Sequence, residues 1–251
     1  MLAAILFLFS ACSGDAPGTE TGLLDALSTT ATQARYTLAW DTEGVEVADG
    51  SWSVETDLGY QVTLSRGYLS TYSLYLIPCP EADHARRWSL IRAAHAGHSL
   101  TEDDSMLLSP QLEDIAAMDA SEHDSVLFDE TEYCEVSYVT ARADDRSEGM
   151  PDDLDLRNVT LYLEGQLSAP GEAPAAFQWS TALFYGRSEH IVLAGDGDRA
   201  HVRVERQLST MFDGVDFADV SEARAMDLVL QNLINHTTFT TDLEPRRGDS
   251  P

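Results

Sequence analysis

Three histidines lie close together in the sequence, and their spacing is suited to binding a metal. His84, His95 and His98 all fall between Cys79 and Cys134, and the last two form the motif His-Ala-Gly-His. Two neutral imidazoles three residues apart share one face of a helical turn or converge in a Gly-containing loop, which gives nitrogen ligands for copper or zinc. We therefore predict a metal site with His95 and His98 as first ligands and His84 as the third. The alternative is that all three are ordinary solvated loop histidines.

The two cysteines that flank this segment also have defined chemistry. Cys79 and Cys134 each belong to a strand-like run, and they are an even pair once Cys12, which is part of a separate signal, is set aside. An even number of cysteines in an exported chain favours a disulfide between neighbouring parts of a sheet. The alternative is a cysteine ligand to a soft metal, although neither residue sits in a CxxC cluster.

The first residues resemble the export signal of a bacterial lipoprotein. Residues 2–9 are an apolar run, too short for a bilayer core that needs about 20 helical residues, and Ser-Ala-Cys12 follows as in a lipobox. We predict a signal peptide over residues 1–11, lipidation of Cys12 and a tether over residues 12–33. The lipid would attach the protein to the membrane of the bacterial cell envelope, on the periplasmic side or at the outer-membrane surface. The alternative is an uncleaved hydrophobic tail.

The charge of the chain excludes several classes of function. Asp and Glu number 43 against 15 basic residues, which gives a formal net charge of -28, and Lys does not occur. A repelling field of this sign argues against nucleic acid as a partner and raises the local concentration of cations. A lysine Schiff base and a P-loop are excluded, and GxSxG, HExxH and CxxC motifs are missing. We expect no enzymatic activity.

The hydrophobic pattern predicts a mainly β protein. Short runs of alternating polar and apolar residues, bounded by turn residues, are typical of a sandwich or barrel. We predict strands at 36–40, 51–55, 60–64, 68–77, 133–141, 156–167, 177–185, 191–194 and 201–208. The expected fold is an antiparallel β-sandwich, immunoglobulin-like or jelly-roll-like, as a single domain over residues 34–240. A disordered tail would follow over residues 241–251.

Two helices are expected beside these strands. Ser221 can cap a C-terminal amphipathic helix, in which Ala225, Leu228, Val229, Asn232 and Leu233 recur at three- and four-residue steps. A shorter helix is predicted over residues 111–118. The acidic stretch 212–219 is read either as a Ca²⁺ ligand set or as the turn that begins the C-terminal helix. The four tryptophans, at positions 40, 52, 88 and 179, are expected to pack against the sheets.

Three segments together resemble the MbnP-type family of periplasmic and surface copper-binding proteins, the partners of di-haem peroxidases. They read YQVTLSRGYLSTYSLYL at 60–76, FDETEYCEVSY at 128–138 and MFDGVDF at 211–217. The resemblance implies a β-sandwich that binds copper through histidines, with a di-haem peroxidase as partner. In some members a tryptophan beside the copper is oxidised to kynurenine, and Trp88 is the candidate here because it lies near the histidines.

Overall fold

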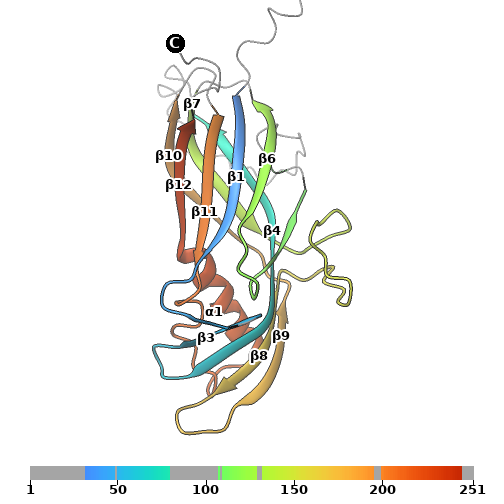
Figure 1. Ribbon diagram of the computed structural model, residues 1–251, viewed down its shortest axis with the longest axis vertical. Coiled ribbons are helices and arrows are strands. Elements are labelled where there is room, and N and C mark those ends of the chain that lie inside the picture. Colours follow the sequence, from blue (N-terminus) through green and yellow to red (C-terminus); the bar gives the residue numbers. More distant parts are fainter. Residues whose placement is uncertain are drawn as a thin grey trace, which may run out of the picture. The chain divides into compact units, whose positions relative to one another are not determined.

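Two β-sheets packed against each other and one helix make up the described part of the chain (Figure 1). The computed structural model describes residues 32–48, 50–79, 107, 109–128, 132–194 and 199–244. The prediction of a mainly β sandwich with a C-terminal helix is therefore confirmed.

The smaller sheet has four strands and joins the two ends of the described chain. Its order is β12 (Thr237–Glu244), β11 (Arg199–Gln207), β1 (Thr32–Asp41) and β6 (Ser121–Phe128). β1 and β11 run parallel, whereas the other pairs are antiparallel. The sheet is thus mixed rather than purely antiparallel, because the paired strands β1 and β11 are far apart in sequence and no hairpin sets their relative direction.

The larger sheet is built around one long strand, β4 (Gln61–Pro78). On the main path the order is β10-β7-β4-β3-β2, while β5 pairs with β4 and β8 pairs with both β4 and β9. The bounds of these strands are β2 Glu46–Ala48, β3 Ser51–Glu55, β5 Gln111–Asp114, β7 Glu132–Thr140, β8 Leu161–Ser168, β9 Ala175–Thr181 and β10 Tyr185–Ala194. The first half of β4 therefore pairs with β3 and β8, and its second half pairs with β5 and β7.

The prediction of two separate strands over residues 60–64 and 68–77 is wrong, because β4 is one continuous strand. The register against β8 shifts between Leu64 and Arg66, so the interruption at Ser65 is a β-bulge inside one continuous strand. The glycine that follows is a packing residue and not a turn. A Cβ on Gly67 would lie 2.8 Å from Leu64 Cδ2 and 3.2 Å from Ile115 Cβ.

Four other elements differ from the predictions. Residues 111–118 do not form a helix, because Gln111–Asp114 pairs with β4 as strand β5. The predicted strand 156–167 begins only at Leu161, and the predicted strand 177–185 is interrupted between β9 and β10. β12 continues to Glu244, four residues into the predicted disordered tail, because it completes the edge of the smaller sheet beside β11.

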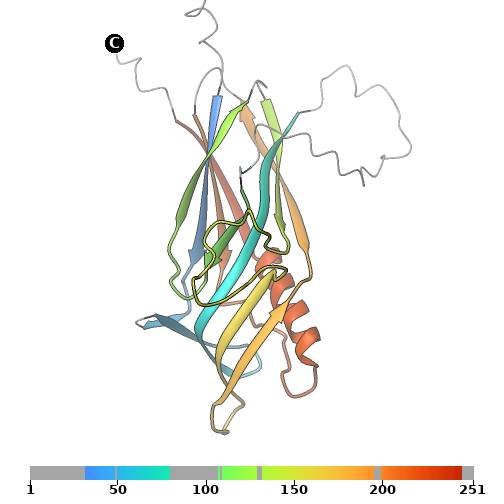
Figure 2. The same ribbon diagram turned by 90° about the vertical axis from the view of Figure 1, so that its right-hand side faces the viewer.

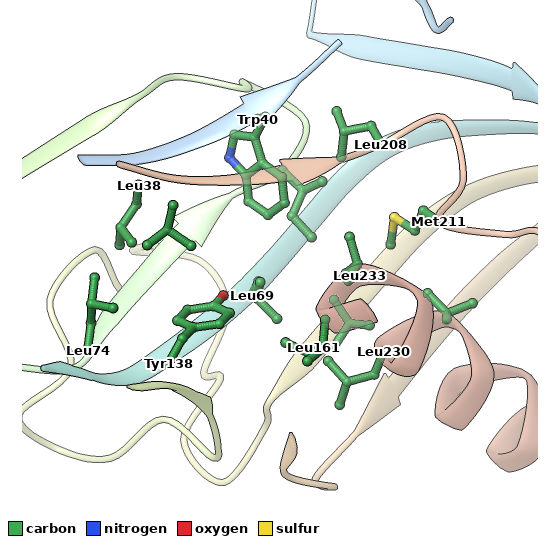
Figure 3. Close-up of a cluster of buried hydrophobic side chains, with 14 of the residues drawn as sticks. Leu38, Trp40, Leu69, Leu74, Tyr138, Leu161, Leu208, Met211, Leu230 and Leu233 are labelled. Carbon is green, nitrogen blue, oxygen red and sulfur yellow. The ribbon is translucent and has the colours of Figure 1, made fainter. Parts of the chain in front are cut away.

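The main core lies between the sheets and continues under the helix. Figure 3 shows side chains from both sheets, including Leu38, Trp40 and Tyr138, in one cluster with Leu230 and Leu233 of α1. Trp40 and Trp52 are buried and Trp179 packs against the core, as predicted for three of the four tryptophans. Trp88 lies outside the described residues.

The helix α1 (Glu222–Asn235) begins where its cap predicts. Arg224 N donates to Ser221 Oγ at 3.4 Å, and Ala225, Val229 and Leu233 lie on the buried face. The helix packs on β9, β10 and β11, as Figure 2 shows for the first two. Among the described residues, no helix combines the length and apolar character needed to cross a bilayer.

Arg187 on β10 holds the C-terminal end of α1 in place. Its Nη1 donates to the carbonyl oxygens of Asn235 and Thr237 at 2.7 Å each and to that of Ile234 at 3.3 Å, and its Nη2 pairs with Glu189 at 2.9 Å. The last carbonyls of a helix have no partner within the helix, so a cation at this point satisfies them and favours the helix dipole.

Replacing Arg187 with alanine should therefore destabilise the fold. We expect Arg187→Ala to lower the free energy of unfolding by about 2–3 kcal/mol, because charge-assisted hydrogen bonds to backbone carbonyls are lost. Urea denaturation measures this change. The matched control is Arg203→Ala on β11, whose guanidinium pairs with Glu205 on the same strand and which should cost less than about 1 kcal/mol. Equal effects of the two substitutions would contradict the assigned role.

Candidate functional site

The three predicted metal ligands, His84, His95 and His98, lie outside the described residues, and so does the predicted lipidation site Cys12. We call residues 80–106 the histidine-bearing segment. The structure describes the residues that flank it, Cys79 and Leu107. Within the described ranges, no group of three or more His, Cys, Asp or Glu side chains is arranged to hold a metal ion.

The first end of the histidine-bearing segment is fixed by a disulfide. Cys79 directly follows β4, Cys134 lies on the neighbouring strand β7, and their sulfur atoms are 1.98 Å apart with Cα atoms at 4.7 Å. Pro78 pairs with Tyr133 after a register shift at Ile77, so the bridge joins adjacent strands of one sheet. The predicted disulfide is confirmed.

Leu107, the residue after the histidine-bearing segment, contacts β4. Leu107 N donates to Leu74 O of β4 at 3.0 Å, and the Leu107 side chain is buried in the main core. The two described residues that flank the histidine-bearing segment, Cys79 and Leu107, are therefore both held beside the second half of β4.

A buried ion pair connects the two sheets. Arg206 of β11 is fully buried, and its Nη2 donates to Glu113 Oε2 of β5. Glu113 Oε1 accepts a second hydrogen bond, at 2.6 Å, from Thr71 Oγ1 of β4. Each partner compensates the charge that the other brings into the interior, where an unpaired charge is costly.

An aromatic ring covers the other side of this guanidinium. The Arg206 Cζ atom lies 4.1 Å from the ring centroid of Trp40 on β1, which is the geometry of a cation–π contact. Within the described part of the chain, Arg206 Nε and Nη1 and Trp40 Nε1 have no hydrogen-bond partner. Three buried nitrogen donors of this network therefore have no hydrogen-bond acceptor among the described residues.

Tyr138 adds β7, the strand that also carries Cys134, to this network. Its hydroxyl lies 3.2 Å from Thr71 Oγ1, and its ring packs edge-on against Phe239 with centroids 6.2 Å apart. Burial raises the pKa of Tyr138 to about 12 because the phenolate would be poorly solvated there. The hydroxyl thus stays protonated at every physiological pH.

His123 of β6 interacts electrostatically with two carboxylates, those of Glu113 and Glu148. It is half-buried, and Nε2 lies 2.9 Å from Ser121 Oγ. Burial lowers the pKa of His123, while the carboxylates of Glu113 and Glu148 act in the opposite direction. Hydrogen bonds from Ser109 and Gln111 lower the pKa of Glu148. His123 is therefore a neutral imidazole near neutral pH and was not among the predicted ligands.

The acidic stretch 212–219 is a turn held in place by hydrogen bonds to neighbouring segments. Tyr60 donates to Asp216 Oδ1 at 2.7 Å, and Gly214 N donates to Asp57 Oδ1 at 2.8 Å. Asn232 of α1 donates to Asp213 O at 2.8 Å and fixes the stretch to the helix. These carboxylates accept backbone and phenol hydrogens, which accounts for them without Ca²⁺.

The Glu113–Arg206 network supports the fold and offers no reaction centre. A guanidinium with no exposed surface cannot meet a substrate from solvent, and the Tyr138 hydroxyl is held protonated. One signal in the sequence indicates this network, although the network was not predicted. Val202, Val204 and Arg206 alternate on β11, so the charge occupies an inward-facing position.

Comparison of the chain with models of known protein families, with curated proteins and with solved structures finds no match.

The buried ion pair makes a testable prediction about stability. Replacing one partner alone, by Arg206→Met or Glu113→Leu, should lower the free energy of unfolding by about 3–5 kcal/mol, because the other charge stays buried and unpaired. The double variant should be more stable than either single variant, since both charges are gone. Urea denaturation of the unmodified protein, the two single variants and the double variant gives the coupling energy.

A matched cycle on the partly exposed pair Arg203 and Glu205 should show coupling below about 1 kcal/mol. Additive losses at Arg206 and Glu113 would refute the coupling.

Tyr138 predicts how stability changes at high pH. Its folded pKa of about 12 exceeds the ordinary value of 10.0, so its contribution is complete below pH 10 and is lost as the pH rises through 12. We expect a fall in the free energy of unfolding of about 2–3 kcal/mol over this interval. Tyr138→Phe should remove this share of the fall, as measured by denaturation between pH 9 and 12. Tyr72→Phe, at a partly exposed tyrosine of β4, is the control. An unchanged slope in Tyr138→Phe would contradict the assignment.

Proposed function

We propose that this chain is a lipid-anchored protein of the bacterial cell envelope that binds copper, or another late transition metal, through His84, His95 and His98. Cys12 would carry the lipid, and a di-haem peroxidase would be the partner that the resemblance to the MbnP-type family implies. In this proposal the protein has no catalytic activity of its own.

One observation carries the proposal. The Cys79–Cys134 bridge and the hydrogen bond from Leu107 to Leu74 hold the two residues that flank the histidine-bearing segment beside β4. A segment closed at both ends loses less conformational entropy when its side chains gather around an ion than a free segment does. The fixed flanking residues therefore lower the entropic cost of gathering the three imidazoles around one ion.

Electrostatics supports the same proposal. A net charge of -28 concentrates cations near the protein. Imidazole nitrogen is a good ligand for copper and zinc, whereas carboxylates alone would favour harder ions such as Ca²⁺. Selectivity for a late transition metal would thus come from the histidines, and the acidic surface would raise the rate of encounter.

The histidine pair predicts the outcome of a metal titration. The purified chain should bind one equivalent of Cu(I) or Cu(II), and affinity should fall as the pH drops through about 6.5, because protonated imidazole cannot ligate. The double variant His95→Ala/His98→Ala should lose this site, as followed by competition with a chromogenic chelator. The matched control is His190→Ala/His236→Ala, since both of these histidines are exposed and described. Equal binding by the two double variants would remove the proposed ligands.

A second candidate function is metal-free assembly with another envelope protein. Its support is the exposed apolar surface on and beside β10, an end strand of the larger sheet's main path, where Phe184 is 75% and Val192 71% exposed. Exposed apolar residues at a sheet edge are typical of a contact surface. This function requires no stoichiometric metal in the native protein, and a crosslinker placed at Phe184 should capture one defined partner.

A further inference from the structure

A groove of about 490 Å³ lies over four strands of the larger sheet, away from the disulfide. Its lining residues come from β3, β4, β8 and β9. They are Ser51, Thr63, Ser65, Glu164, Gly165, Gln166, Ala176, Phe177 and Gln178. Trp52, Leu64 and Leu163, which alternate with these residues, are buried in the core, so the groove is on the outer face of the sheet.

The groove lies where β4 is bulged and where two strands approach closely. The register shift between Leu64 and Arg66 leaves Ser65 as the extra residue, and Ser65 is exposed. Beside it, a Cβ on Gly165 would be 2.0 Å from Thr63 O, so only glycine allows this approach of β8 to β4. A bulge next to a glycine bends the sheet locally and re-aims side chains, as is frequent beside binding sites.

Aromatic packing makes the floor of the groove rigid. Phe177 lies beneath it and is 8% exposed, and its ring centroid is 4.3 Å from that of Trp179. Trp179 in turn stacks on Phe217 at 5.5 Å. The groove is therefore formed by the fold itself and needs no rearrangement before a ligand binds.

The walls carry neutral hydrogen-bonding groups, which is unusual for so acidic a chain. They present the hydroxyls of Ser51, Thr63 and Ser65 and the carboxamides of Gln166 and Gln178. Among the described residues, the side chains of Ser51, Thr63 and Gln166 form no hydrogen bond. These groups donate and accept equally well, so they can pair with a partner of the same character.

The remaining polar groups are already engaged. Glu164 is the one carboxylate in the lining, and its Oε2 accepts a hydrogen bond at 2.7 Å from Tyr162. Gln178 Nε2 donates to the same Tyr162 hydroxyl at 2.9 Å, which orients the carboxamide and leaves its oxygen available. An anion would meet the field of a chain with net charge -28. A bare cation would find no cluster of carboxylates.

We propose that this groove binds a neutral oligosaccharide. A sugar chain offers many hydroxyls that donate and accept, which matches the hydroxyl and carboxamide walls, and it carries no charge to be repelled. The groove spans three strand spacings of about 4.8 Å each, roughly 14 Å in all, which accommodates a short oligosaccharide. This inference does not depend on the metal proposal.

The test is a titration of the full chain with defined sugars. Maltohexaose, cellohexaose and N-acetylchitohexaose are the neutral probes, and hexagalacturonate is the anionic comparison. At least one neutral probe should bind with a dissociation constant of about 0.1–1 mM by calorimetry. In ¹⁵N-labelled protein, the side-chain amide signals of Gln166 and Gln178 should shift during the titration. No binding of any neutral probe at 10 mM, or equal binding of hexagalacturonate, would overturn the proposal.

Variants at the exposed rim locate the binding without disturbing the core. Gln166→Ala/Gln178→Ala should weaken the binding of the neutral probe by about tenfold or more through lost hydrogen bonds. Ala176→Trp should abolish binding by filling the groove. Thr238→Ala/Thr240→Ala, at exposed positions of β12 in the other sheet, is the matched control and should leave affinity unchanged. Affinity that survives both groove variants would also overturn the proposal.

Discussion

The pairing of β4 (Gln61–Pro78) determines where every other strand of the larger sheet can lie. At about 3.3 Å per residue, its 18 residues extend for close to 60 Å. No single neighbour covers that length, so different strands pair with its two halves, and further strands add to those. The bulge at Ser65 and the closely packed Gly67 let one strand serve both halves without breaking the ladder. A break in β4 would separate the halves of the sheet from each other.

The two sheets are held in register by apolar burial together with one polar network. Burial of leucine, valine and aromatic side chains provides most of the attraction, but it is non-directional and tolerates sliding. The contacts of Arg206 with Glu113 and Trp40 are directional, and they link β11, β5 and β1 at a fixed point. A misplaced charge would be left unpaired in the interior, so this network specifies one arrangement of the sheets against its alternatives.

The groove and Cys79, the residue that precedes the histidine-bearing segment, lie toward opposite ends of β4. The groove uses Thr63 and Ser65 near the start of the strand, whereas Cys79 follows its last residue. About 14 residues of extended strand, roughly 45 Å, lie between them. A rigid strand can hold both regions without coupling them, so loss of one function should leave the other intact. The disulfide then stabilises only the end of the sheet at Cys79.

Local patterns in the sequence determined the fold class, the disulfide and the C-terminal helix. Alternation along the strands, the parity of Cys79 and Cys134 and the cap at Ser221 are short-range signals, and each reports on its own neighbourhood. The copper site and the lipid anchor remain predictions, because their residues lie outside the described part of the chain. Only the tertiary structure decided the parallel pairing of β1 with β11 and the strand at Gln111–Asp114, which the sequence suggested was helical. Those features depend on partners distant in the sequence, and hydrogen bonds to a distant strand overrode the local preference.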